Sequence, residues 1–230
     1  MFSVLDNPIW QALTSLDADK NTGTGNFAWL DADIAPFMGM PCWDEKSQHE
    51  LLLHAPRERS WFLLYSEEVR FIDEYKIVFT IPLYQYYCKN PGKEPATKKK
   101  VEIVPLDMAN VDEMIALTAL TKPGPFGKRT IEFGNYHGIF EDGKLVAMGG
   151  ERLHLEGLTE ISAICTHPDY QGRGYGAKMT HYLAESVMQK GETPFLHARV
   201  DNLKAIDLYK KLGFEIRTGM QFYIFRKADG

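Results

Sequence analysis

The second half of the chain alternates between two hydrophobic periods. Apolar residues three and four positions apart predict helices at residues 110–120, 175–190 and 202–212. Runs rich in β-branched and aromatic residues predict strands at 101–105, 136–140, 144–148, 158–166, 195–200, 214–217 and 221–226. Asp142-Gly143 is typical of a tight turn between the second and third of these strands. The expected order is β-α-β-β-β-α-β-α-β-β, closed by a strand pair.

The first hundred residues carry a sparser pattern. Asn7-Pro8 is typical of a helix start, because Asn caps helices and Pro is favoured at their first position. The spacing of apolar residues predicts a second helix at 44–54, and β-rich runs predict strands at 61–65 and 76–84. We expect a smaller N-terminal α/β region, residues 1–90, and find no catalytic motif in it.

Residues 88–100 interrupt the apolar pattern with two prolines, a glycine and a run of cations. We therefore place a linker at residues 91–99. The lysine triplet at 98–100 is compatible with a phosphate-binding patch, but we interpret it as part of a solvated linker.

The composition is that of an ordinary globular protein. A hydrophobic fraction of 44% in 230 residues allows a buried core. The net charge of −5 argues against nucleic acid or an anionic membrane as the main partner, so any phosphate site must be local. Cys42, Cys88 and Cys165 are too few and too scattered for a disulfide framework or a metal site. Without a signal-peptide pattern or a run of about 18 apolar residues, we expect a soluble, cytoplasmic protein without a membrane partner.

Residues 159–176 form the most informative segment. A strand ends at Thr166, and Gln171-Gly-Arg-Gly-Tyr-Gly176 then opens a helix. Glycines leave the backbone bare, so consecutive N–H groups and the positive end of the helix dipole can face one anion. A diphosphate suits such a site, although glycine spacing alone is also compatible with a structural turn.

Two other phosphate-binding patterns fit less well. A Walker loop is excluded because no Gly-Lys-[Ser/Thr] closes the motif. Gly172-x-Gly174-x-x-Ala177 formally fits the dinucleotide fingerprint. That fingerprint opens a domain with further β-α units and follows its strand directly, whereas here only about fifty residues remain and 167–170 intervene. An oxidoreductase is therefore the weaker interpretation.

Two motifs together resemble the GCN5-related N-acetyltransferase (GNAT) superfamily. Gln171-x-x-Gly174-x-Gly176 is similar to its acyl-CoA signature. Residues 200–214, Val-Asp-Asn-Leu-Lys-Ala-Ile-Asp-Leu-Tyr-Lys-Lys-Leu-Gly-Phe, resemble its Asn…Ala…Tyr…Leu-Gly-Phe helix. The resemblance covers about residues 100–228, and the stretch from His167 to Gly174 looks most like the FR47-like branch of bacterial acetyltransferases.

The resemblance implies an α/β (α+β) GNAT fold, a mixed, mostly antiparallel twisted sheet flanked by helices, over residues 100–230. The minimal family fold lacks a counterpart of residues 1–90. A degenerate half-copy, as in some two-lobed acyltransferases, is one explanation for this region.

The resemblance also implies acetyl-CoA as the cofactor. In the family, the CoA diphosphate binds backbone amides of the glycine-rich turn, here those of Gly172, Arg173, Gly174, Tyr175 and Gly176. The Gln171 side chain is a further candidate. The pantetheine arm adds to the preceding strand, here at Ile164, Cys165 and Thr166, and Asn202 resembles the asparagine that contacts this arm. Arg173 could instead face solvent, and Asn202 could be a structural N-cap.

Family members transfer the acetyl group directly to an amine. Tyr209 resembles the tyrosine that protonates the leaving CoA thiolate, with a core tyrosine as the alternative. Glu160 falls where related histone acetyltransferases carry their general-base glutamate; a polar edge residue is the alternative, and Glu151 is the reserve. We expect Cys165 to pack rather than to act as a nucleophile.

The acceptor side is less defined. Phe126 and Arg129 lie in the loop after the first helix of the second half, where the family places acceptor contacts. Phe126 is the candidate to wall the pocket, Arg129 to hold an acidic group, and Glu151 is the third substrate-binding candidate. The acceptor and the oligomeric state stay open.

We therefore expect an acetyl-CoA-dependent N-acetyltransferase acting on a primary amine of a small molecule, amino acid, peptide or protein. The alternative is a non-catalytic acyl-CoA-binding or interaction module.

Overall fold

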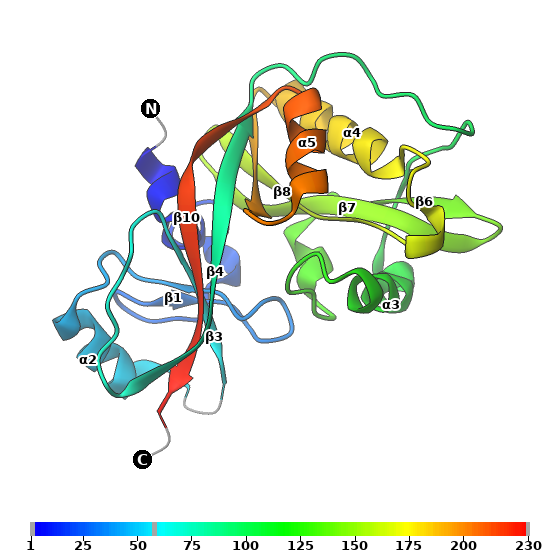
Figure 1. The fold of residues 1–230 in the computed structure, drawn as a ribbon. Helices are drawn as coiled ribbons and strands as arrows, with labels where there is room; N and C mark the ends of the chain where they lie inside the picture. Colours follow the sequence, from blue (N-terminus) through cyan, green and yellow to red (C-terminus); the bar gives the residue numbers. More distant parts are fainter. Residues whose placement is uncertain (1–2, 57–58, 229–230) are drawn as a thin grey trace.

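A computed structural model describes residues 3–56 and 59–228 of the chain. The described residues form an eight-stranded sheet with the order β3-β10-β4-β9-β8-β7-β6-β5. A separate two-stranded sheet pairs β1 (Ala28–Trp29) with β2 (Met38–Gly39). The large sheet is strongly twisted, so that its two halves run almost crosswise in Figure 1.

One half of the large sheet is built from consecutive antiparallel strands. They are β5 (Val104–Pro105), β6 (His137–Glu141), β7 (Lys144–Leu155) and β8 (Leu158–Thr166). The β6–β7 hairpin turns at Asp142 and Gly143, which both have positive φ, as the Asp-Gly sequence predicts.

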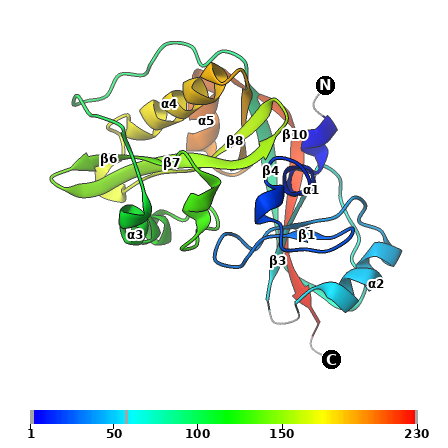
Figure 2. The same cartoon turned by 180° about the vertical axis from the view of Figure 1, so that it is seen from behind.

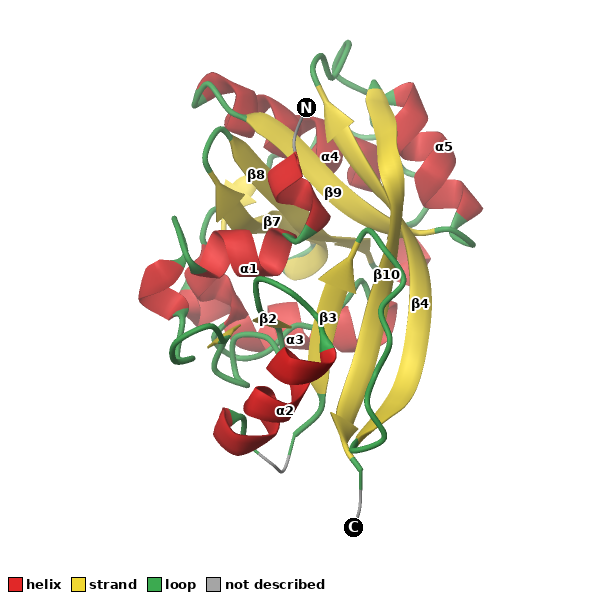
Figure 3. Ribbon diagram, turned by 90° about the vertical axis from the view of Figure 1, so that its left-hand side faces the viewer, coloured by secondary structure: helices red, strands yellow, loops and turns green. Residues whose placement is uncertain are grey.

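The other half pairs strands that are far apart in the sequence. These strands are β9 (Thr193–Arg199), β4 (Tyr75–Cys88), β10 (Phe214–Lys227) and β3 (Trp61–Tyr65). β9 runs parallel to β8, and β4 lies antiparallel between β9 and β10 (Figure 3). Strands from the first ninety residues thus share one sheet with strands from the second half. The mixed, mostly antiparallel sheet flanked by helices confirms the expected fold class.

Helices cover both faces of the sheet (Figures 1 and 2). They are α4 (Tyr175–Gln189) and α5 (Leu203–Lys211) on one face, and α1 (Pro8–Leu13) and α3 (Val111–Thr121) on the other. Leu183 and Ile206 belong to the core beneath α4 and α5. Leu13 and Met114 belong to the core on the opposite face. Each face therefore buries its own apolar layer, which supplies most of the folding free energy.

A third, aromatic core lies beside α2 (Glu45–His54). The Trp43 ring packs edge-on against Phe225 of β10, with ring centroids 5.2 Å apart. Short 3₁₀ helices join the larger elements: η1 (Ser3–Asp6), η2 (Ala18–Lys20), η3 (Met108–Asn110), η4 (Thr130–Phe133) and η5 (Pro168–Tyr170).

The expected closing strand pair, 214–217 and 221–226, is wrong. β10 is one continuous strand, because Thr218 and Gly219, which were expected to lie in a turn, pair with Gln85 and Tyr84 of β4. The irregularity in this region is a register shift between Ile216 and Thr218, which bends the strand without ending it.

Residues 89–103 contain no helix or strand. This segment, which includes the predicted linker 91–99, leaves β4, crosses the outer side of α4 and reaches β5 (Figures 1 and 2). Over the described ranges, no helix combines the length and apolar character needed to cross a bilayer.

Candidate active site

The sheet opens between β8 and β9. Their parallel pairing ends at Glu160 and Phe195, although β8 continues to Thr166 and β9 to Arg199. A register shift in β8 and a positive φ of 54° at Ala163 mark a β-bulge just beyond the last pair. An alanine in this left-handed conformation is strained by about 1 kcal/mol, so the surrounding structure must enforce the bend.

Beyond Glu160, one backbone edge of β8 has no partner strand among the described residues. From residue 161 to residue 166, no described strand pairs with β8 on its β9 side. The residues predicted for the pantetheine arm, Ile164, Cys165 and Thr166, lie on this open edge. An extended ligand with amide groups can add to such an edge as a short extra strand.

The glycine-rich turn, residues 171–176, follows the open edge after η5. Gly172 and Gly174 have φ values of 73° and 90°, which side chains rarely adopt, and α4 begins at Tyr175. Among the described residues, no hydrogen-bond acceptor is found for the N–H groups of residues 172–176. A Cβ at Gly172 would meet no atom within 4 Å, so this backbone is bare. Free amides at the start of a helix fit a diphosphate.

The β6–β7 hairpin holds the turn through Glu141. Arg173 lies over the Tyr170 ring and donates to Glu141 Oε1 at 3.0 Å. The Tyr175 hydroxyl donates to the same carboxylate, and Lys99 Nζ lies 3.1 Å from its Oε2. These partners, Tyr175 first, keep the pKa of Glu141 below its ordinary value. Arg173 therefore braces the turn, and its guanidinium is not simply exposed to solvent.

Tyr209 lies on α5, on the same face of the sheet as α4. Its half-buried ring packs between Tyr86 and Phe214, with centroids 5.7 and 5.8 Å away. Burial, together with Tyr86, raises the pKa of Tyr209 to about 12, so the hydroxyl stays protonated near neutral pH. Asn202, two helical turns away, accepts a hydrogen bond from the Ala205 N–H at 3.2 Å and so caps α5.

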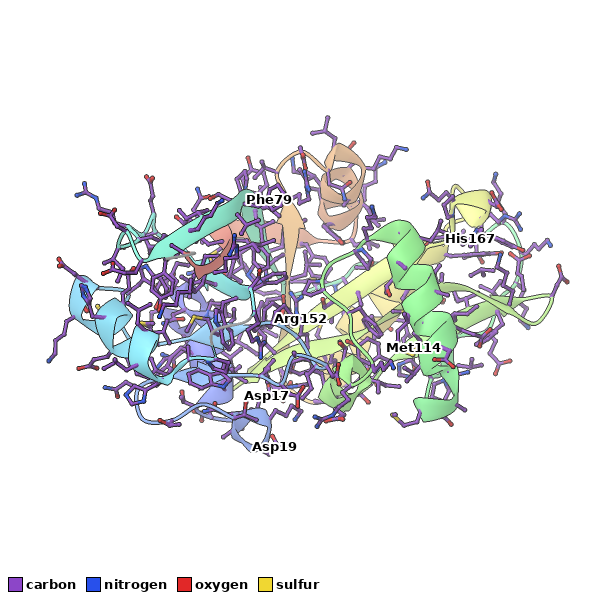
Figure 4. All side chains as sticks on the ribbon, turned by 90° about the horizontal axis from the view of Figure 1, so that it is seen from below. Asp17, Asp19, Phe79, Met114, Arg152 and His167 are labelled. Carbon is purple, nitrogen blue, oxygen red and sulfur yellow. The ribbon has the colours of Figure 1, made fainter. Side chains whose placement is uncertain are left out.

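Glu160 faces the opposite way, into the core with α1 and α3. Its carboxylate is fully buried, at 2.8 Å from Arg152 Nε and 2.7 Å from His197 Nδ1. Burial alone would raise the pKa of Glu160, but Arg152 and His197 outweigh it and lower the pKa to about 2. Figure 4 shows Arg152 near the middle of the molecule, between the N-terminal region and α3. A carboxylate this weakly basic is a poor proton acceptor, so the geometry favours a positioning role for Glu160 over that of a general base.

Cys165 is buried on the face of α3. Burial raises the pKa of its thiol to about 11. A thiol held protonated at neutral pH is unsuited to nucleophilic attack, in keeping with the expectation that Cys165 packs. Thr166, the next residue, places its Oγ1 3.5 Å from the position a Cβ on Gly176 would take.

The residues predicted for the acceptor side have partners within the protein. Arg129 is ion-paired with Asp31 and Glu132, and Glu151 is buried against Lys190 and His154. Phe126 packs half-buried against the Tyr136 ring, with centroids 5.6 Å apart. Their charged or aromatic groups are therefore engaged within the protein, and an acceptor role for these three residues stays a prediction.

The N-terminal region also borders this side of the sheet. Arg129 N–H donates to the Asp33 carbonyl at 2.9 Å, and His154 of β7 binds Asp17 at 2.9 Å. These contacts fix the loop after α3 to the connection between β1 and β2, and fix β7 to the segment before β1.

Sequence reasoning missed Glu141, Arg152 and His197. The position of Glu141 just before the Asp-Gly turn was predictable. Nothing in the sequence indicates that its side chain contacts Arg173. Arg152 is on β7 and His197 on β9, and only the pairing of both strands with β8 brings them to Glu160. No described group of three or more His, Cys, Asp or Glu side chains has an arrangement suited to a metal ion.

Known proteins match this chain both over the segment that contains the turn and over its full length. A model of the FR47-like protein family matches residues 136–223. A solved structure of a putative GNAT-family acetyltransferase from Novosphingobium aromaticivorans is 31% identical and superposes with a TM-score of 0.87, covering 98% of this chain and 99% of that one. The chain belongs to the GNAT family.

Curated relatives match a shorter stretch. Mycothiol acetyltransferase of Mycolicibacterium smegmatis is 34% identical over 80 residues, 33% of this chain and 27% of that protein. Thialysine N-epsilon-acetyltransferase of Sus scrofa is 35% identical over 96 residues, 41% of this chain and 50% of that protein. The chain thus spans a quarter to a half of the length of these relatives. Its GNAT membership rests on the full-length structural match.

Proposed function

We propose that this GNAT protein transfers an acetyl group from acetyl-CoA directly to a primary amine. The observation that carries the proposal is the row of unpartnered amides at residues 172–176, continuous with the open edge of β8. The amides match the diphosphate of CoA, and the open edge matches the amide groups of its pantetheine arm.

In this arrangement the thioester lies where β8 and β9 separate. A neutral amine attacks the carbonyl carbon, the new C–N bond forms and the C–S bond breaks. A backbone N–H of β8 aimed at the carbonyl oxygen stabilises the charge that develops there. Binding both reactants at one opening in the sheet supplies the proximity that a direct transfer needs.

Tyr209 is our candidate for the group that faces the leaving sulfur. Its hydroxyl stays protonated because its pKa is about 12, whereas a thiol ordinarily has a pKa of about 8.5. The hydroxyl therefore donates a hydrogen bond that stabilises the thiolate as it forms. The proton released by the attacking amine can then complete the thiol.

Glu160 lies at the point where β8 and β9 separate. It is the last β8 residue paired with β9, and its contacts to Arg152 of β7 and His197 of β9 tie three strands together at the fork. We propose that Glu160 positions the strands and that the proton of the amine leaves by another route.

The relatives indicate the chemical class of the acceptor group but not the identity of the acceptor molecule. The name of thialysine N-epsilon-acetyltransferase describes acetyl transfer to an ε-nitrogen. We propose that the acceptor here is likewise a primary amine. Cofactor, acceptor and reaction are all tested by one assay, the release of free CoA thiol from acetyl-CoA across a panel of amines.

We expect CoA release that depends on one class of primary amine, with the acetylated amine found by mass spectrometry. Binding of CoA without release on any amine would instead support the non-catalytic acyl-CoA-binding module. The absence of both binding and release would contradict the cofactor assignment itself.

A further inference from the structure

The segment between β4 and β5 is fastened across α4. We name residues 90–100 the strap. Its Gly92 carbonyl lies 3.3 Å from Nε2 of His181 on α4, and Glu94 forms an ion pair with Lys178, also on α4. The Asn90 carbonyl packs so closely on Gly213 that a Cβ there would lie 2.2 Å away. The strap is therefore held along its length and is not a freely solvated linker.

The far end of the strap contacts the glycine-rich turn itself. Lys98 N–H donates to the Arg173 carbonyl at 3.1 Å. The Ala96 carbonyl lies 2.7 Å from the position a Cβ on Gly174 would take. Because Gly174 has no side chain, the strap can pack closely against it on one side. A ligand can then reach the free amides of the turn.

These contacts bring the lysine triplet beside the turn. Lys99 is ion-paired with Glu141, which it shares with Arg173. Lys98 and Lys100 are exposed, and neither forms an ion pair with a carboxylate in the described part of the chain. In a protein of net charge −5, two uncompensated cations beside an anion site are a local reversal of charge.

We propose that Lys98 and Lys100 bind the ribose 3′-phosphate of CoA, while the amides of residues 172–176 bind the diphosphate. CoA carries phosphate at two places, the diphosphate and the ribose 3′-phosphate, and the proposed function assigns the amides of the turn to the diphosphate. Ammonium groups suit the second because a terminal phosphate monoester carries nearly two charges near neutral pH. This inference rests on the proposed function and assigns to the strap the discrimination of CoA from its dephosphorylated form.

The test compares binding of CoA and of dephospho-CoA, which lacks the 3′-phosphate, by calorimetry. The wild-type protein should bind CoA about tenfold more tightly than dephospho-CoA. The double variant K98Q/K100Q should bring this ratio close to one while leaving the affinity for dephospho-CoA nearly unchanged. All four lysines changed in the test and control are exposed, so the variants are expected to fold.

The matched control is K46Q/K76Q, which removes the same charge from exposed positions on α2 and β4. It should keep the wild-type ratio. An unchanged ratio in K98Q/K100Q, or a wild-type ratio near one, would overturn the role of the strap but not the proposed function. A wild-type protein that binds neither ligand would overturn the proposed function, and the inference with it.

Discussion

The glycine-rich turn and Glu160 belong to one strand-turn-helix segment, but their polar groups differ in whether they have hydrogen-bond partners within the protein. In the turn, the N–H groups of residues 172–176 find no acceptor among the described residues. Around Glu160, the carboxylate is satisfied by Arg152 and His197 in full burial. Because burial of an unpaired polar group is costly, the saturated charges around Glu160 indicate a structural role. The amides of the turn are partly exposed at the start of a helix, so they are available to a ligand.

The comparison separates two residues that the sequence placed together as catalytic. Tyr209 has a hydroxyl with no hydrogen-bond partner in the described chain and lies on the face of α4. Glu160 lies on the other face and is fully paired. Loss of Glu160 should therefore act mainly on stability, and loss of the Tyr209 hydroxyl mainly on turnover.

The largest expected effect is that of Glu160→Ala. Removing the carboxylate leaves Arg152 and His197 without their buried partner, which should lower the free energy of unfolding by about 3–5 kcal/mol. Urea denaturation measures this loss. Glu156→Ala, an exposed carboxylate at the β7–β8 turn, is the control and should change stability little. A Glu160→Ala protein of wild-type stability would contradict the structural role.

Tyr209→Phe should lower kcat by roughly 10- to 100-fold, because the leaving thiolate loses a hydrogen-bond donor. The affinity for CoA and the unfolding free energy should change little, since the ring and its packing are retained. Steady-state kinetics with calorimetry separate the two effects. Tyr182→Phe, on the exposed side of α4, should behave as the wild type. Full kcat in Tyr209→Phe would remove this residue from the mechanism.

Gly174→Ala should weaken CoA binding by roughly tenfold or more. The new Cβ would have to displace the Ala96 carbonyl at 2.7 Å and would strain a φ of 90°, so the amides would shift. Gly191→Ala is matched in strain, with φ of 80° at the other end of α4 and no atom near its Cβ. In both variants the strained φ should cost about 1 kcal/mol of stability, but only Gly174→Ala, which also displaces Ala96, should lose affinity. Equal affinity in the two variants would argue against the turn as the diphosphate site.

A further expected effect is a pH dependence of stability. Burial lowers the pKa of His154, but its bonds to Asp17 and Glu151 outweigh this and raise the pKa from 6.5 to about 9. The folded state thus binds this proton more tightly, so the stabilisation is complete below pH 6.5 and is lost as pH rises through 9. Glu160 and Glu151, with pKa values of about 2, contribute stability above pH 4.5 that is lost on acidification.

Unfolding measured from pH 6.5 to 9.5 should therefore show a decline on the order of 2 kcal/mol in the wild type. His154→Gln should be less stable at pH 6.5 and should show little of this decline. An equally steep decline in both proteins would mean that another group titrates.

The sequence predicted the features that depend on neighbouring residues. The turn, the start of α4 and the Asp142-Gly143 hairpin follow from local glycine chemistry, and all three lie where they were expected. The pairing of β4 with β9 and β10 could not be predicted, because it joins residues more than a hundred positions apart. The partners of Glu160 and the path of the strap over the turn were missed for the same reason.

We propose above that the amides of residues 172–176 and the open edge of β8 together bind CoA. A titration of ¹⁵N-labelled protein with CoA, followed by backbone amide chemical shifts, tests it most directly. We expect the largest shifts at residues 172–176, smaller ones at 164–166, and little change at Glu151 and Arg152. Saturable binding whose shifts leave residues 172–176 unmoved would contradict it.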